Sequence, residues 1–162
     1  MFCSNNRDNK QTTDNRQQTT DTKHQTPNTK HHTMSSIFTK IINGEIPSYK
    51  VAETKDYIAF LDVNPNTVGH TLCVPKIEVD KLFDLDEVTY IGLMDFSRSV
   101  AFAIEKAIPC QRVGMSVIGL EVPHVHVHLI PLNSMDDARF INKVNLEKEE
   151  FEAIAKKISD RL

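Results

Sequence analysis

Three histidines alternate with apolar residues in the segment that runs from Pro123 to Pro131. In an extended strand, side chains point alternately to opposite faces, so His124, His126 and His128 share one face. The opposite face then carries only apolar side chains. At roughly 3.3 Å per residue, successive histidine Cα atoms lie about 6.6 Å apart, so the three rings can surround one small anionic group.

Imidazole suits such a site because its ordinary pKa lies near neutrality. One ring can act as a neutral nucleophile while a neighbour donates a proton. The sequence has no Lys or Arg between Arg112 and Arg139, so imidazolium, backbone N–H groups and hydroxyls are expected to meet the charge of a phosphate. The pattern predicts transient handling of one phosphoryl group rather than tight binding of a polyphosphate.

Two other interpretations of the histidine strand are open. A polar strand face can simply be solvated, and two strand histidines at i and i+2 can chelate zinc. Zinc usually takes a further Cys or carboxylate ligand, and Glu121 is the only close candidate in the sequence. The glycine spacings of the familiar phosphate loops, G-x-x-x-x-G-K and G-x-G-x-x-G, do not occur.

The elements that position the histidines follow from capping residues and hydrophobic spacing. Ser36 and Gly44 bound a short helix, and Pro109 ends a long one. The sequence predicts helices over 37–42, 86–107 and 146–162, and strands over 49–53, 57–62, 70–75, 112–118 and 124–130. Without repeated βα alternation, this order predicts an α+β fold with a five-stranded antiparallel sheet.

The first 33 residues differ in composition from the rest of the chain. Met1, Phe2 and Cys3 are the only apolar side chains before Met34, so this stretch has too little to bury to offset the entropy of ordering. We expect a disordered polar extension over residues 1–33 and one domain over residues 34–162. An alternative is that the extension precedes a natural start at Met34.

Charge and composition favour a cytoplasmic protein that binds neither membranes nor nucleic acid. No apolar run is long enough for a signal peptide or a membrane span. Five basic and three acidic residues give residues 1–33 a charge of +2, so residues 34–162 carry −5 of the total of −3. An acidic domain is a poor ligand for polynucleotides. Three cysteines without C-x-x-C spacing are expected to be reduced thiols.

The sequence resembles the histidine triad (HIT) family, whose signature is His-φ-His-φ-His-φ-φ with φ apolar, here His124 to Ile130. The likeness covers about residues 36–133 and is closest to the branch of histidine triad nucleotide-binding proteins. In the N-terminal half, the following segments keep the order of the family: Ile37-Phe38, Lys40-Ile41-Ile42, Glu45-Ile46-Pro47, Ala59-Phe60-Leu61-Asp62, Asn64-Pro65, Gly69-His70 and Val74-Pro75-Lys76.

The resemblance assigns each histidine a role. It implies that His126 is the nucleophile and that His128 contacts the phosphate and the leaving group. His124 and His70 are expected to orient and support the site. Many relatives carry Ser or Thr three residues before the first triad histidine, whereas this sequence has Glu121 there, which alters how the leaving group is handled.

The resemblance also implies how a nucleotide is held. Asp62 is expected to bind the ribose hydroxyls, and the backbone N–H of Gly119 is expected to reach the phosphate. The base is expected to lie against apolar residues near the start of the domain. These candidates are Phe38, Ile46, Phe60 and Leu61.

By this resemblance the chain is a hydrolase that acts at the α-phosphate of purine nucleotide conjugates and releases AMP or GMP through a nucleotidyl-histidine at His126. Phosphoramidates and aminoacyl adenylates are the expected substrates, with dinucleoside polyphosphates as the alternative. A non-catalytic module that senses nucleotides or docks a partner is the alternative of another class. A homodimer without cofactor is implied, and Ser35-Ser36-Ile37-Phe38 replaces the Cys-x-x-Cys of zinc-binding relatives, so no metal is expected.

Overall fold

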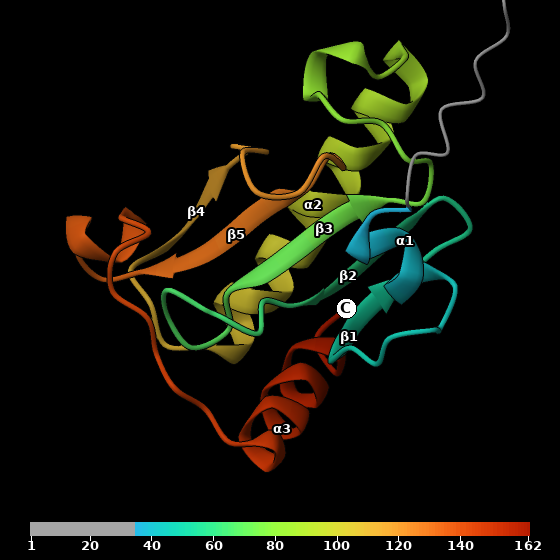
Figure 1. Cartoon of the computed structure of the whole chain (residues 1–162). Coiled ribbons are helices and arrows are strands. Elements are labelled where there is room, and N and C mark those ends of the chain that lie inside the picture. The colour runs from blue at the N-terminus through green and yellow to red at the C-terminus, as the bar shows by residue number, and fades with distance from the viewer. Residues whose placement is uncertain (1–34) are drawn as a thin grey trace, which may run out of the picture. The chain divides into compact units, whose positions relative to one another are not determined.

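The computed structural model describes residues 35–162, which build one antiparallel sheet in the order β1-β2-β3-β5-β4 (Figure 1). The strands are β1 (Lys50–Glu53), β2 (Tyr57–Leu61), β3 (Thr71–Pro75), β4 (Arg112–Ser116) and β5 (Val127–Leu132). The predicted α+β fold with a five-stranded antiparallel sheet is confirmed. The predicted extension over residues 1–33 lies outside the described residues.

Three α-helices accompany the sheet, and their ends follow from capping side chains. They are α1 (Ile37–Ile42), α2 (Glu87–Ala107) and α3 (Lys148–Ser159). Ser36 and Asp86 accept hydrogen bonds from the backbone N–H groups of Thr39 and Thr89, which starts α1 and α2 where the sequence predicts. α3 is shorter than predicted because Glu147 forms its capping box.

Helices cover both faces of the sheet, and each face has its own apolar core. α2 and α3 bury the larger core, to which β5 and the residues before it contribute Val125, Val127 and Leu129. On the other face, α1 covers a smaller core of Phe38, Ile58, Phe60, Leu72 and Val74. None of the helices in residues 35–162 is long and apolar enough to cross a bilayer.

The histidine strand starts later than the sequence predicts. The predicted strand covers residues 124–130, whereas β5 begins at Val127, so His124 and His126 precede the strand. The N–H of His124 bonds to Val122 O at 2.8 Å and that of Val125 bonds to Val79 O at 2.8 Å, so neither joins the ladder. β4 consequently ends at Ser116, opposite His128, two residues before its predicted end.

Gly69, directly before His70, has a backbone conformation that other residues rarely adopt. Its φ is +87°, and a Cβ there would lie 2.9 Å from Cγ1 of Ile108. Gly44 has a similar φ of +77°, but a Cβ there would meet nothing within 4 Å. The two glycines therefore separate backbone strain from steric crowding.

We expect Gly69→Ala to lower the free energy of unfolding by about 2 kcal/mol or more, because strain and overpacking add. Gly44→Ala, which adds strain alone, should cost about 1 kcal/mol. Urea denaturation followed by circular dichroism measures both. Equal losses in the two variants would show that contact with Ile108 contributes nothing.

Candidate functional site

A pocket of about 390 Å³ opens beside the histidine strand. It is bordered by the end of β2, the loop after β4, the start of β5 and the segment after the 3₁₀ helix η2 (Met135–Ala138). Its lining residues are Asp62, Asn64, Ile118, Gly119, Leu120, Glu121, His126, His128, Phe140 and Lys143. Two triad histidines thus face the same space as an acidic residue at the end of β2.

The hydrogen bonds of His126 determine which ring nitrogen carries the proton when the ring is neutral. Its Nδ1 lies 2.7 Å from the carbonyl oxygen of His124, and a carbonyl only accepts, so Nδ1 carries the proton. Nε2 of the neutral ring then holds a free lone pair. The ring of Phe38 packs edge-on at 5.0 Å between centroids and fixes the orientation of the imidazole. The arrangement is that of a positioned nitrogen nucleophile.

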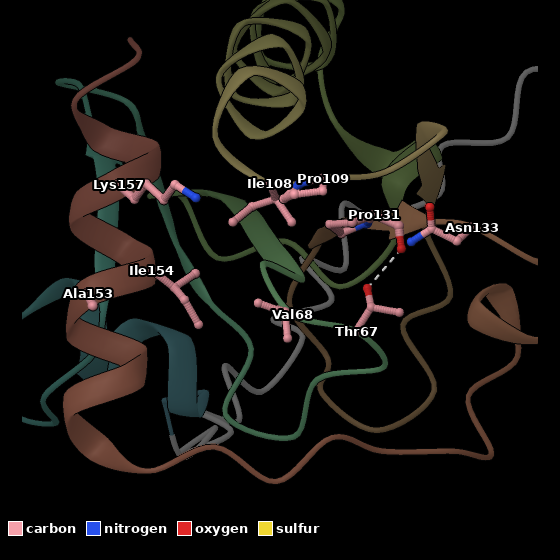
Figure 2. A pocket seen from close by; sticks show the side chains of 9 residues that line it. All are labelled: Thr67, Val68, Ile108, Pro109, Pro131, Asn133, Ala153, Ile154 and Lys157. Carbon is pink, nitrogen blue, oxygen red and sulfur yellow. Dashed lines mark hydrogen bonds between the residues drawn. The ribbon is translucent and has the colours of Figure 1, made fainter.

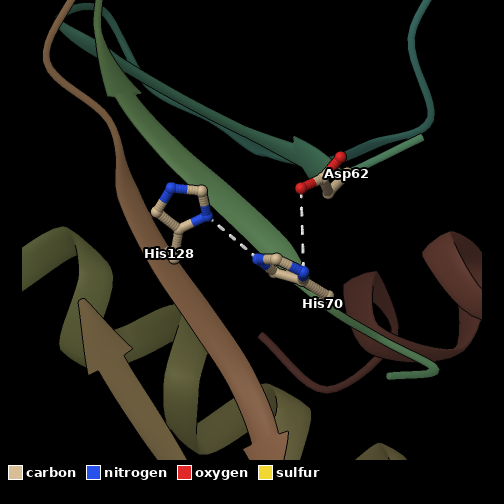
Figure 3. Close-up of side chains that lie close together, drawn as sticks. All are labelled: Asp62, His70 and His128. Carbon is tan, nitrogen blue, oxygen red and sulfur yellow. Dashed lines mark hydrogen bonds and ion pairs between the residues drawn. The ribbon is translucent and has the colours of Figure 1, made fainter. Parts of the chain in front are cut away.

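His128 and His70 form a hydrogen-bonded pair behind the pocket (Figure 3). The backbone N–H of Asn66 donates to Nδ1 of His70 at 3.1 Å, so the proton of His70 lies on Nε2. That Nε2–H donates to Nδ1 of His128 at 3.0 Å. The proton of His128 therefore lies on its own Nε2, where it can donate to a bound phosphoryl oxygen.

Burial keeps both of these rings neutral. Removal from water lowers the pKa of His70 to about 3, and the neighbouring His128 and Lys143 act in the same direction. Burial, followed by His126 and Lys143, lowers the pKa of His128 to about 4. Asp62 approaches Nδ1 of His70 at 3.7 Å. Because His70 is neutral and that nitrogen already accepts from Asn66, this contact is not an ion pair.

His124 faces away from the pocket and joins the triad to the start of the domain. Its Nε2–H donates to the carbonyl of Pro75 at 2.8 Å, which leaves Nδ1 to accept from the hydroxyl of Ser36 at 2.8 Å. Ser36 also caps α1. Burial lowers the pKa of His124. This ring therefore holds the chain rather than the substrate.

Asp62 lies at the end of β2 with 18% of its side chain exposed. The N–H of Asn64 donates to Oδ1 at 2.9 Å, so Oδ2 remains available to a ligand. Burial raises the pKa of this carboxyl above its ordinary value, while the Asn64 hydrogen bond and the Lys143 charge act against the rise. A half-buried carboxylate of this kind suits a pair of ribose hydroxyls.

One group of side chains within residues 35–162 has the composition and spacing of a possible metal site. It consists of Asp62, His70 and His128, whose potential ligand atoms lie within 4.8 Å of one another. A metal ion needs the lone pairs of these atoms. Nδ1 of His70 and Nδ1 of His128 already accept hydrogen bonds. The geometry therefore favours a hydrogen-bonded relay over a metal centre.

The other predicted nucleotide ligands divide between the pocket and the cores. Gly119, with a φ of +70°, and Glu121 line the pocket. Phe38 and Phe60 are buried in the small core behind the histidines, and Ile46 is half-buried after α1. Leu61 lies in the larger core on the opposite face of the sheet. It cannot line the pocket, because it precedes Asp62 and strand side chains alternate.

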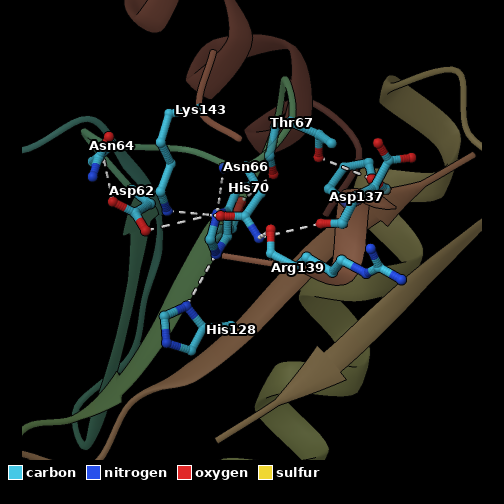
Figure 4. A network of polar contacts seen from close by, with 12 residues as sticks. Asp62, Asn64, Asn66, Thr67, His70, His128, Asp137, Arg139 and Lys143 are labelled. Carbon is cyan, nitrogen blue, oxygen red and sulfur yellow. Dashed lines mark hydrogen bonds and ion pairs between the residues drawn. The ribbon is translucent and has the colours of Figure 1, made fainter. Parts of the chain in front are cut away.

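Sequence reasoning missed the residues that reach the site from the segment after η2. Phe140 packs edge-on against His128 at 5.0 Å between ring centroids, and Lys143 lines the same pocket. The expectation that no lysine or arginine lies at the histidine site is therefore wrong. Lys143 lies 15 residues beyond His128, and only the fold brings it back; Figure 4 shows it beside Asp62 and Asn66.

A second cavity, of about 460 Å³, lies between α3 and the turn before β3 (Figure 2). Its walls are mostly apolar, and Thr67 closes one side by donating to the carbonyl of Pro131 at 2.9 Å. The lining residues are Thr67, Val68, Ile108, Pro109, Pro131, Asn133, Ala153, Ile154 and Lys157. This set contains no nucleophile paired with a base, so the histidine pocket remains the candidate for chemistry.

Comparisons with known proteins point to one family. The model of the HIT domain matches residues 43–135. An uncharacterized HIT-like protein of Borreliella burgdorferi is 38% identical over 132 residues, which are 76% of this chain and 95% of that protein. The crystal structure of a Hit-like protein from Bartonella henselae has a TM-score of 0.70 and 33% identity, covering 78% of this chain and 96% of that one.

Two yeast relatives have a named activity. The adenosine 5'-monophosphoramidase hnt1 of Schizosaccharomyces pombe is 32% identical over 133 residues, covering 80% of this chain and 99% of that protein. The adenosine 5'-monophosphoramidase HNT1 of Saccharomyces cerevisiae is 41% identical over 97 residues, covering 59% of this chain and 61% of that protein.

The neutral histidine pair predicts acid sensitivity. The pKa values of about 3 for His70 and about 4 for His128 lie below the ordinary 6.5, so between these limits the unfolded chain binds protons that the fold does not. The contribution of the two neutral rings to the free energy of unfolding is fully present above pH 6.5, and it falls as the pH drops toward 4. Each ring contributes a slope of up to about 1.4 kcal/mol per pH unit.

We expect His70→Gln, which keeps a donor toward His128 but does not titrate, to have a shallower dependence of unfolding free energy on pH than the wild type. The measurement is urea denaturation at pH 7, 6 and 5. Identical slopes for the two proteins would contradict the assignment of a neutral, buried His70.

Proposed function

The chain belongs to the HIT domain family, and from this premise we propose that it hydrolyses purine nucleotide conjugates at the α-phosphate, with His126 as the nucleophile. The observation that carries the proposal is the hydrogen bond of 2.7 Å from Nδ1–H of His126 to the carbonyl of His124. It leaves Nε2 of a neutral imidazole free at the wall of the pocket. A neutral ring nitrogen is the form that can attack phosphorus.

In the proposed reaction, Nε2 of His126 forms a bond to phosphorus while the bond from phosphorus to the leaving group breaks. The Nε2–H of His128 donates to a phosphoryl oxygen as negative charge develops there. His128 stays neutral, because His70 already donates to its other nitrogen. The leaving amine takes its proton from water at the mouth of the pocket. The hydroxide left by that water accepts a proton from a second water as the second water attacks phosphorus, and the bond from phosphorus to Nε2 breaks, which releases AMP or GMP and restores His126.

The remaining predicted residues complete the proposed site. Asp62 holds the ribose hydroxyls, and the N–H of Gly119 donates to the phosphate. His124 and His70 position the two reacting rings through the hydrogen bonds described above. The base extends along apolar residues of the pocket, and no metal takes part.

Phosphoramidates and aminoacyl adenylates are the preferred substrates in this proposal, and Glu121 supports the phosphoramidates, whose leaving group is an amine. Glu121 lines the pocket together with Asp62, so the pocket carries two carboxylates. An anionic polyphosphate leaving group would be repelled by Glu121, whereas an amine would not. The yeast relatives named adenosine 5'-monophosphoramidases support the same order of substrate preference. Dinucleoside polyphosphates remain the second substrate class.

One observation favours a nucleotide-sensing module as the second candidate function. Glu121 stands where a hydroxyl is common among relatives of this kind, and a carboxylate cannot donate a hydrogen bond when ionised. Such a module would bind AMP without turning over any conjugate. Glu121→Ser would then be the variant that restores turnover.

We expect His126→Ala to lower the turnover of adenosine phosphoramidate by more than about 10⁴-fold, because the nucleophile is removed. AMP binding should stay within a few-fold of the wild type. Released AMP and the intact mass of the protein are measured at short times, with a dinucleoside polyphosphate in parallel. The wild type should show a transient gain of one nucleotidyl group that the variant lacks. Comparable turnover in both proteins would refute the mechanism.

We also propose that the chain forms a homodimer through β4. This strand is at the end of the sheet order, so its outer edge has no partner within residues 35–162, and Met115 on it is 51% exposed. Open edges of this kind pair readily with a second copy.

Light scattering should give twice the chain mass of 18.4 kDa for the wild type. Met115→Lys should shift the protein to monomer, because a charge on an edge strand opposes pairing. Met135→Lys serves as the control, since Met135 is 78% exposed but lies in η2. A monomeric wild type would rule the proposal out.

A further inference from the structure

Residues 137–144, called here the crossing segment, comprise the end of η2 and the chain that follows it along the histidine site (Figure 4). The side-chain amide of Asn66 donates to the carbonyls of Asp137 at 3.2 Å and Arg139 at 3.4 Å. The N–H of Val144 donates to the carbonyl of Pro65 at 2.9 Å. The crossing segment lies beyond residues 43–135, the part of the chain that the HIT domain matches.

The crossing segment brings Lys143 into the pocket and holds it there. Its Nζ donates to Oδ1 of Asn66 at 2.8 Å and lies 5.2 Å from the centre of the Phe140 ring. Both contacts restrict a side chain that is otherwise among the most flexible. Of the ten residues that line the pocket, Lys143 is the one with a permanent positive charge.

The charge of Lys143 acts on the space between Asp62 and the histidine pair. It opposes the rise in the pKa of Asp62 and helps to lower the pKa of His70 and of His128. Lys143 forms no ion pair with a carboxylate of residues 35–162. Its charge is therefore not neutralised by a direct partner in this part of the chain.

We propose that Lys143 contacts the substrate and binds a non-bridging oxygen of the α-phosphate. The inference rests on the proposed function, in which Asp62 holds the ribose and His126 attacks phosphorus. A nucleotide held in this way has its 5'-phosphate at the His126 end of the pocket, and Lys143 lines that pocket together with His126 and His128. An ammonium has three N–H donors, and the bond to Asn66 uses one, so two remain for phosphate oxygens.

A purely structural role for Lys143 is the competing explanation. In that case its bond to Asn66 would only fasten the crossing segment, and Asn66 would in turn hold His70. The two roles differ in their dependence on ligand charge. A residue that binds phosphate affects AMP but not adenosine, whereas a loosened segment disturbs both ligands or neither.

The test uses the full chain and three variants. Lys143→Gln keeps an N–H donor and removes the charge, and Lys143→Arg keeps the charge. Lys148→Gln is the matched control, because Lys148 is 72% exposed on α3 and does not line the pocket. Isothermal titration with AMP and, by competition, with adenosine gives the ratio of the two affinities for each protein. Thermal unfolding of every variant shows whether the fold is retained.

We expect Lys143→Gln to weaken AMP binding about 10-fold, the order of one charge-assisted hydrogen bond, and to leave adenosine binding unchanged. Lys143→Arg should recover most of the loss, and Lys148→Gln should match the wild type. Added NaCl should weaken AMP binding more in the wild type than in Lys143→Gln. If Lys143→Gln does not fold, Lys143→Met provides the same comparison.

The inference is overturned if Lys143→Gln retains the wild-type ratio of AMP to adenosine affinity, or if both affinities fall together. It is also overturned if the wild type does not bind AMP. A wild type that binds AMP but neither releases it from conjugates nor forms the adduct refutes the proposed hydrolase alone. The binding ratio then still decides the role of Lys143.

Discussion

One backbone hydrogen bond, from the N–H of Asn66 to Nδ1 of His70, determines which ring nitrogens of His70 and His128 carry a proton. A backbone N–H only donates, so His70 must carry its proton on Nε2 and pass a hydrogen bond to His128. His128 is then left with a proton directed away from His70. The same residue, through its side chain, holds the crossing segment and Lys143. Asn66, a turn residue, thus links the histidine rings to the pocket wall.

Much of this architecture is predictable from the alternation of histidine and apolar residues. Val125 and Val127 must be buried beneath helices, so the histidines must occupy the other face, and the structure agrees. Capping by Ser36 and Asp86 is equally local and equally predictable. The start of β5 is not predictable in this way, because it depends on whether the N–H of Val125 bonds to β3 or to the carbonyl of Val79. Both choices give extended chain and the same side-chain alternation.

The placement of Leu61 is predictable from the alternation of side chains along a strand. Once Asp62 is assigned to the site, its neighbour Leu61 has to point into the opposite core, so the sequence alone is enough to exclude Leu61 from the pocket. Phe140 and Lys143 carry no such signal. They belong to a segment without regular periodicity, and their position follows from hydrogen bonds to Pro65 and Asn66 that join residues more than 70 positions apart.

The pocket combines rings kept neutral by burial with charges at its border. Burying four histidines is costly unless each polar nitrogen has a partner. Among the described residues, Ser97 Oγ is the only buried side-chain polar atom without a hydrogen bond, so every buried nitrogen of the histidine cluster has a partner. Neutral rings can attack or donate but cannot balance the charge of a phosphate. In the proposed function that task belongs to Lys143, which comes from a part of the chain that the triad motif does not include.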